Sequence, residues 1–85
     1  MKKVYIVEIQ NDWDPYYDVD SVYANKEDAL NYAASYIVNH WSPDDDDVWQ
    51  DEMEETGKYI SKFDFAKEAA ENGEWFARVT EYAVV

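Results

Sequence analysis

Eight acidic residues stand within twelve consecutive positions near the middle of this 85-residue chain, with no Lys or Arg among them. These residues are Asp44, Asp45, Asp46, Asp47, Asp51, Glu52, Glu54 and Glu55. Carboxylates are almost never buried unless a cation or a hydrogen-bond donor accompanies them. The segment must therefore lie at the surface, and the hydrophobic core has to come from the rest of the chain.

The length and composition of the chain predict one small domain over residues 1–85. Chains divide into separate cores only at two or three times this length, and one this short buries about 60–65% of its unfolded surface. No cysteine is present to add a disulfide or a thiolate-bound zinc ion. Aromatic residues make up 18% of the chain and supply large buried areas instead.

The N-terminal segment lacks the pattern of an export signal. Lys2 and Lys3 are basic, but the apolar run over residues 4–7 is too short for a signal core and ends at Glu8. No segment approaches the roughly 20 apolar residues that span a bilayer. We therefore expect a cytoplasmic protein that makes no contact with a membrane.

Residues 4–9 have the β-branched and aromatic composition of a central strand. Tyr5, Val7 and Ile9 fall on one face and Val4 and Ile6 on the other. Because both faces carry apolar side chains, cover on both sides of this strand is expected.

Two further strands are predicted, over residues 18–24 and 74–85. Turn residues at positions 10–17 are expected to close a hairpin between the first strand and the second. Within the second strand Val19, Ser21 and Tyr23 alternate with their neighbours, which predicts that these three share one face.

Three helices are predicted between the second strand and the third. The first, over residues 25–41, has apolar residues at helical spacing. Ser42 and Pro43 are start signals for the second, which we place over residues 43–56 and which ends at the glycine at 57. The third covers residues 59–72 and ends at a second glycine.

This order, β-β-α-α-α-β, predicts an α+β fold. A right-handed crossover makes the last strand parallel to the second. The last strand then lies antiparallel to the first, which gives a three-stranded antiparallel sheet of order 2-1-3 with two or three helices on one face.

Three short stretches of the chain resemble a group of small bacterial and phage domains of unknown function. They are Val4-Tyr5-Ile6-Val7, Val22-Tyr23-Ala24-Asn25-Lys26-Glu27-Asp28-Ala29 and Val79-Thr80-Glu81-Tyr82-Ala83-Val84. In that group a hairpin, a helix with a similar first turn and a final strand bearing Glu-Tyr make the whole protein. The resemblance spans about half of the chain, implies a phage or bacterial origin and assigns no active-site residue. Residues 42–57 stand outside it as an acidic helical insertion.

The acidic segment admits three interpretations. In a helix Asp44, Asp47, Asp51 and Glu55 share one face at about 5–6 Å spacing. That spacing resembles the spacing of phosphates along a nucleic-acid strand, so a groove built for DNA would accept it. The alternatives are a solvated helix whose charge serves solubility, and a metal site. Trp49, within the same segment, either packs on the core or anchors a charged interface.

A second acidic group surrounds the predicted hairpin and consists of Asp12, Asp14, Asp18 and Asp20. The spacing of Asp12 and Asp14 suggests the start of a calcium loop. However, Tyr17 stands where that loop needs Gly, and Tyr23 stands where it needs Glu. We therefore predict no metal site here, and treat the group as a plain loop or as a second contact patch beside the acidic helix.

No catalytic or cofactor motif is present. The chain has no cysteine, no nucleophile elbow and no glycine-rich phosphate loop, and its single His, His40, is placed at a helix end where it suits the helix dipole. Direct binding to nucleic acid is disfavoured, because a net charge of −13 repels phosphates. We predict no enzyme, no cofactor and no direct nucleic-acid contact.

The leading hypothesis is a phage-encoded inhibitor that acts by DNA mimicry in the host cytosol. A domain of this length is roughly 30 Å across, and duplex DNA of that length carries about 18 phosphates. The chain carries 20 carboxylates, and in charge it resembles the acidic phage proteins that block restriction or CRISPR nucleases. Its expected partner is a positively charged nucleic-acid-handling protein. The alternative is a small acidic accessory domain. A homodimer through an exposed edge of the second or third strand is left open.

Overall fold

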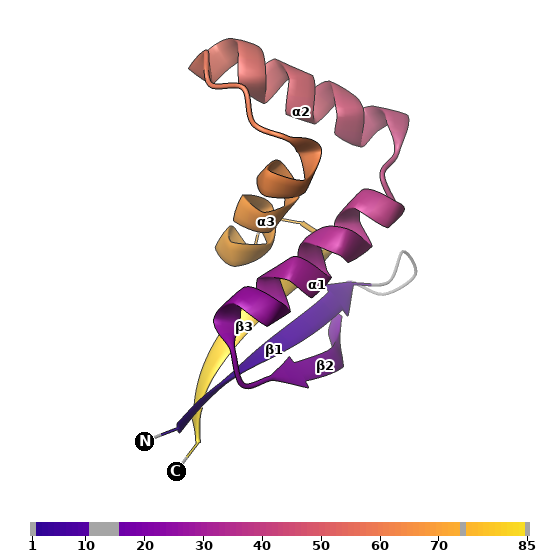
Figure 1. Cartoon of the computed structure of the whole chain (residues 1–85). Helices are drawn as coiled ribbons and strands as arrows, with labels where there is room; N and C mark the ends of the chain where they lie inside the picture. The colour runs from indigo at the N-terminus through magenta and orange to yellow at the C-terminus, as the bar shows by residue number, and fades with distance from the viewer. Residues whose placement is uncertain (1, 11–15, 74, 85) are drawn as a thin grey trace.

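The computed structural model describes residues 2–10, 16–73 and 75–84 and confirms the predicted element order (Figure 1). The strands are β1 (Lys2–Gln10), β2 (Tyr17–Tyr23) and β3 (Ala77–Val84), and the helices are α1 (Lys26–Asn39), α2 (Pro43–Thr56) and α3 (Lys62–Asn72). Residues 11–15, where the hairpin loop is predicted, lie outside the described residues. The predicted bounds of α2 agree with the structure, whereas α3 begins three residues later than predicted.

The three strands form one antiparallel sheet of order β2-β1-β3, as predicted. The main-chain pairing continues past β3, because the N–H of Gln10 donates to the carbonyl of Phe76 at 2.6 Å. The fold is therefore α+β, with the first strand in the centre of the sheet.

A β-bulge in β2 contradicts the predicted alternation of that strand. Val7 lies opposite Ser21, but the next residue of β1, Glu8, lies opposite Val19, so Asp20 is an extra residue in the ladder. Residues directly opposite each other point to the same face of a sheet. Val19 therefore lies on the face opposite to that of Ser21, although the simple alternation places them together.

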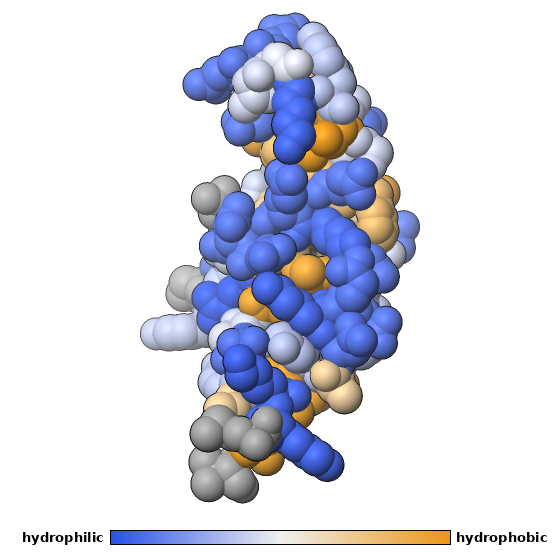
Figure 2. Space-filling view, turned by 60° about the vertical axis from the view of Figure 1, so that its left-hand side comes forward, coloured by the Kyte–Doolittle hydropathy of each residue, from blue (hydrophilic) through white to orange (hydrophobic). Residues whose placement is uncertain are grey.

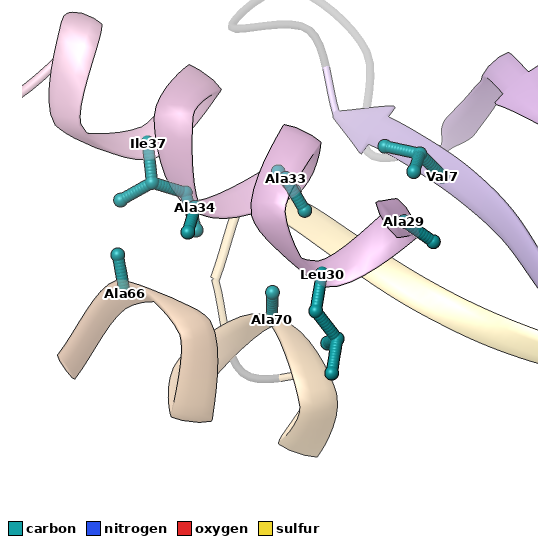
Figure 3. Close-up of a cluster of buried hydrophobic side chains, with 9 residues drawn as sticks. Val7, Ala29, Leu30, Ala33, Ala34, Ile37, Ala66 and Ala70 are labelled. Carbon is teal, nitrogen blue, oxygen red and sulfur yellow. The ribbon is translucent and has the colours of Figure 1, made fainter. Parts of the chain in front are cut away.

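Helices α1 and α3 lie against one face of the sheet and pack closely on each other (Figures 1 and 3). Figure 3 shows Ala34 and Ile37 of α1 directed toward Ala66 of α3. Alanines supply most of the fully buried positions: Ala29, Ala33, Ala34, Ala66, Ala70 and Ala77. Short side chains let two helices approach closely, which is how a thin core reaches close packing here.

No helix covers the opposite face of the sheet in the described part of the chain, which differs from the cover expected for both sides of β1. This open sheet face carries seven apolar or aromatic side chains: Val4, Ile6, Tyr17, Val19, Val22, Tyr82 and Val84. Val19 is 62% exposed and Val22 is 56% exposed. The sequence predicts cover on this side because Val4 and Ile6 are apolar. In the structure, β1 is packed against the helices through its other face only.

A cluster of aromatic rings joins the end of the sheet to the helices. The Trp41 and Trp75 ring centroids lie 5.4 Å apart, and the Phe65 ring meets Trp75 edge-on at 5.5 Å. These rings come from the segment before α2, from α3 and from the segment before β3. The cluster therefore ties the α1–α2 junction to α3 and to the end of the sheet.

Candidate functional site

Helix α2 lies at one end of the molecule, and the two chain ends lie at the other (Figure 1). The molecule measures 44 × 30 × 17 Å along its principal axes. Most of the surface seen in Figure 2, including the α2 end at the top, is hydrophilic. The acidic segment therefore forms an ordered projecting element of the fold.

Local signals at both ends fix α2. The Ser42 hydroxyl accepts from the N–H of Asp45 at 3.1 Å, and the Asp45 carboxylate accepts from the N–H of Ser42 at 3.0 Å, which is a complete capping box. Pro43 occupies the first turn, and the carboxylates there favour the positive end of the helix dipole. Gly57 ends the helix at φ +68°, a left-handed conformation that suits glycine.

Few side chains attach α2 to the rest of the molecule. Met53, 4% exposed, is its single buried residue. Both main-chain groups of Ile60 bind α2: the Ile60 N–H donates to Met53 Sδ at 3.2 Å, and the Ile60 carbonyl accepts from Trp49 Nε1 at 3.2 Å. The connection between α2 and α3 is therefore held to α2 by two of its side chains.

Trp49 makes packing contacts, one of the two roles that the sequence left open, and its contact with a partner stays a prediction. Its ring is half-buried, its N–H is bonded to Ile60, and Lys62 Nζ lies 5.3 Å from the ring centroid. These contacts fill the side of the indole that faces the molecule. Trp49 thus helps to attach the acidic helix to the rest of the molecule.

Asp46 is the acid of α2 with the most intramolecular contacts. It pairs with Lys62 Nζ at 2.7 Å and accepts hydrogen bonds from Gln50 Nε2 at 2.7 Å and from Trp41 Nε1 at 3.3 Å. The hydrogen bond from Lys62, followed by that from Trp41, lowers the pKa of the Asp46 carboxyl below its usual value of 3.8. Asp46 and the capping residue Asp45 therefore hold the helix in place.

The other six acids of α2 are exposed, and we call them the acidic ridge: Asp44, Asp47, Asp51, Glu52, Glu54 and Glu55. Asp44, Asp47, Asp51 and Glu55 lie on the side of the helix opposite Met53, as their spacing predicts. No ion pair with a described Lys or Arg neutralises any member of the ridge. The ridge is therefore an uncompensated band of negative charge, with Glu52 and Glu54 on its two sides.

Acids outside α2 are compensated to a greater degree. Among the described residues, four acids outside α2 pair with a cation from a different element: Glu81 with Lys3, Glu71 with Lys26, Glu27 with Lys67, and Glu8 with Arg78. All seven Lys and Arg of the sequence lie outside α2, and the one that pairs with an α2 acid, Lys62, contacts Asp46. Unpaired negative charge is therefore denser on α2 than on the rest of the described chain.

The second acidic group is only partly described. Asp12 and Asp14 lie outside the described residues, while Asp18 and Asp20 are exposed in β2. The Tyr32 hydroxyl of α1 donates to the Asp20 carboxylate, which raises the pKa of Tyr32 above its usual value of 10.0. Asp20 is thus directed toward α1.

The base of the hairpin lies beside the start of α2. Gln10 at the end of β1 and Asp45 of α2 line one shallow depression of about 540 Å³, together with Tyr36, His40, Trp41, Ser42 and Phe76. His40 Nδ1 lies 2.9 Å from the Tyr36 carbonyl, and its ring stacks on Tyr36 at 4.1 Å. His40 therefore packs at the end of α1, the structural role expected for it.

An apolar groove of about 350 Å³ between α2 and α3 was not predicted. Its floor contains Met53, Ile60, Phe65 and Trp75, and its rim contains Glu52 and Glu68 together with Val48, which is 48% exposed. The apolar spacing of Val48 and Met53 is the one sequence signal for this groove. This groove places apolar side chains along one edge of the acidic ridge.

Within the described ranges, no group of three or more His, Cys, Asp or Glu is arranged to hold a metal ion. No described helix has the length and apolar character needed to cross a membrane. Comparisons of this chain with models of known protein families, with curated proteins and with solved structures find no match.

Proposed function

We propose that this chain is a non-catalytic binding protein that uses the acidic ridge of α2 to occupy a basic, DNA-binding groove of another protein. The partner would be a nucleic-acid-handling protein such as a restriction or CRISPR nuclease. The protein would then be a phage-encoded inhibitor that works in the host cytosol. The observation that carries the proposal is that none of the six ridge acids is in an ion pair with a described Lys or Arg, whereas four of the nine described acids outside α2 are.

The density of charge along α2 supports DNA mimicry. A helix of 14 residues is about 21 Å long. One strand of duplex DNA carries a phosphate every 3.4 Å or so, which is about six over that length. The ridge presents six exposed carboxylates. A row of Lys and Arg that matches one DNA strand would therefore meet four carboxylates on one side of α2, with Glu52 and Glu54 flanking them.

Besides its charge, the preformed helical structure of α2 supports the proposed binding. Its capping box and its glycine stop are formed without a partner. A ligand that is ordered before binding loses less conformational entropy on association than a flexible acidic tail. The second acidic group, Asp12, Asp14, Asp18 and Asp20, is proposed as a further contact, and among the described residues Gln10 at the end of β1 lines the same depression as Asp45 of α2.

Neutralising the ridge tests the proposal. The variant Asp47→Asn/Asp51→Asn/Glu55→Gln removes three exposed charges and leaves Asp45 and Asp46 in their structural contacts. We would measure plasmid cleavage by a panel of restriction and RNA-guided nucleases, and displacement of a fluorescent DNA duplex from each. The parent should inhibit at least one nuclease, and the variant should be at least about tenfold weaker.

A matched control separates position from net charge. Asp28→Asn/Asp64→Asn/Glu68→Gln also removes two Asp and one Glu charges, all from exposed residues of α1 and α3. This variant should inhibit as the parent does, and inhibition by the parent should weaken as salt rises from about 0.05 M to about 0.3 M. Equal loss in both variants, no loss in either, or no inhibition across the panel would contradict mimicry. It would favour an accessory domain whose charge serves solubility.

A further inference from the structure

The open sheet face differs from the rest of this acidic molecule in its charge. Glu8 is the single described acid on it, because Asp18 and Glu81 lie opposite helix-side residues and Asp20 is bonded to Tyr32 of α1. Lys2 and Arg78 are the cations of the face. A face with one acid, in a chain with 20 acids, is a marked exclusion of negative charge.

The charge of Glu8 is neutralised by contacts within the same chain. It is 9% exposed, it lies 3.4 Å from Arg78 Nε, and it accepts a hydrogen bond from the Thr80 hydroxyl at 2.6 Å. The Arg78 guanidinium lies 3.8 Å from the centroid of the Tyr17 ring. Glu8 is therefore paired within its own chain, although the buried Arg78 Nε makes no hydrogen bond, and the rest of the face exposes Val22, Tyr82 and Val84.

We infer that the open sheet face binds a second copy of this chain, so that two sheets stack face to face in a symmetric dimer. The inference goes beyond the proposed function and does not depend on it. Its basis is the coincidence, on one uncovered face, of exposed apolar side chains with the exclusion of acids. The α2 helices, at the far end from the chain termini, remain free in such a dimer (Figure 1).

The charge of the face selects a second copy over a basic partner. A basic protein is drawn to negative surface, and this face offers none beyond the neutralised Glu8. In a symmetric stack of two such faces no described acid of one copy meets an unpaired acid of the other, because the single described acid of the face, Glu8, is already paired with Arg78 in its own chain. Two copies can therefore bring these apolar faces together without placing acids against one another.

The area of the face is sufficient for a reversible dimer. Three strands at about 4.8 Å spacing, with about eight residues each at about 3.3 Å, give a face of roughly 14 by 26 Å. Stacked sheets lie about 10 Å apart with their inner side chains interdigitated. Because side chains project from this flat area and add accessible surface, two copies bury on the order of 1,000 Å² in total. That value is the lower limit for a specific interface.

Salt distinguishes this contact from the proposed contact of the ridge. Two chains of net charge −13 repel each other, and salt screens that repulsion while the apolar contact remains. Dimerisation should therefore strengthen with salt, whereas binding of the ridge to a basic groove should weaken. The two proposals fail independently.

Sedimentation velocity on the full chain tests the dimer. From about 1 µM to about 500 µM the parent should change reversibly from monomer to dimer, with association at least about tenfold tighter at about 0.5 M salt than at about 0.05 M. Val22→Lys and Tyr82→Lys place a cation on the open sheet face and should each shift the midpoint to at least about tenfold higher concentration.

Val48→Lys is the matched control, because Val48 of α2 is exposed to a similar degree as Val22 but lies on a different surface. It should dimerise as the parent does, with circular dichroism confirming that all three variants fold. A parent that stays monomeric at both salt concentrations overturns the inference. So does a dimer that Val22→Lys and Tyr82→Lys leave unchanged, which would indicate pairing at a strand edge instead.

Discussion

The body of the molecule, made of the sheet with α1 and α3, and the projecting helix α2 are stabilised in different ways. In the body, side chains from four elements are fully buried, and ion pairs join α1 to α3 and β1 to β3. Helix α2 buries one side chain, Met53, and depends on its caps and on the contacts of Asp46. The body is ordered by packing, and α2 is ordered largely by local signals.

This difference explains how one short chain carries both a core and a dense line of charge. Like charges three and four residues apart on a helix destabilise it, by tenths of a kcal/mol per pair. In α2 the capping box, the acids of the first turn and the glycine stop offset that repulsion without requiring burial. Because so little of α2 contacts the core, its exposed residues are free to serve recognition, and the two regions should respond differently to mutation.

The largest effect is expected in the body, at Ile37. This side chain is fully buried where α1 meets α3 (Figure 3). Ile37→Ala should lower the free energy of unfolding by about 2–5 kcal/mol, since it removes buried methyl groups and leaves a cavity. Chemical denaturation monitored by circular dichroism measures this, and Ile37→Val should cost only about 0.5–1.5 kcal/mol. A loss below 1 kcal/mol or so for Ile37→Ala would show that the alanine-rich core is loosely packed.

Met53→Ala should separate the two regions. Removing the single buried side chain of α2 should destabilise that helix by about 2 kcal/mol, the low end for such a substitution, because the site can relax toward solvent. Native-state hydrogen exchange should then show faster exchange in α2, while the amides shared by β1 and β3 keep their protection. Val48→Ala, at an exposed position of α2, is the control and should change neither. If Met53→Ala speeds exchange equally in β1 and β3, α2 and the body unfold as one unit.

A smaller loss is expected at the N-terminus of α2. Ser42→Ala removes the acceptor for the Asp45 N–H and should cost about 1 kcal/mol of helix stability. Ser35→Ala, at an exposed position within α1, matches the chemistry without a cap and should be neutral or slightly stabilising. Hydrogen exchange of the α2 amides should distinguish the two variants. Equal behaviour would mean that tertiary contacts, rather than the cap, determine where α2 begins.

The element order, the sheet order and the bounds of α2 were predictable from the sequence, because each rests on a local signal. Ser42, Pro43 and Gly57 mark the ends of α2 without reference to the rest of the fold. A right-handed crossover then leaves one position for the last strand. The bulge at Asp20 was not predictable, since alternation of side chains gives no sign of an extra residue in a ladder.

Within the candidate site, the sequence could locate the acids but could not assign their contacts. Eight acids in a row of twelve positions look equivalent, yet Asp45 is held by the capping box and Asp46 by three side chains. Two of those three, Lys62 and Trp41, come from outside α2, and their positions depend on how α1 and α3 meet. The exclusion of acids from the open sheet face depends in the same way on strand register.

Asp46 gives the last and smallest of these effects, a dependence of α2 on pH. Its pKa is lower in the folded chain than the usual 3.8, chiefly because Lys62 donates to it. A carboxyl with a lowered pKa stabilises the fold fully above its unfolded pKa, and this contribution is lost as pH falls through the folded pKa. The Trp41 indole N–H resonance, followed by NMR from neutral pH to below pH 3.8, should move as Asp46 protonates. In Asp46→Asn that movement should disappear, while the α2 amides exchange faster at neutral pH than in the parent. A Trp41 signal that titrates identically in both proteins would mean that another acid, rather than Asp46, holds the end of α2 to the aromatic cluster.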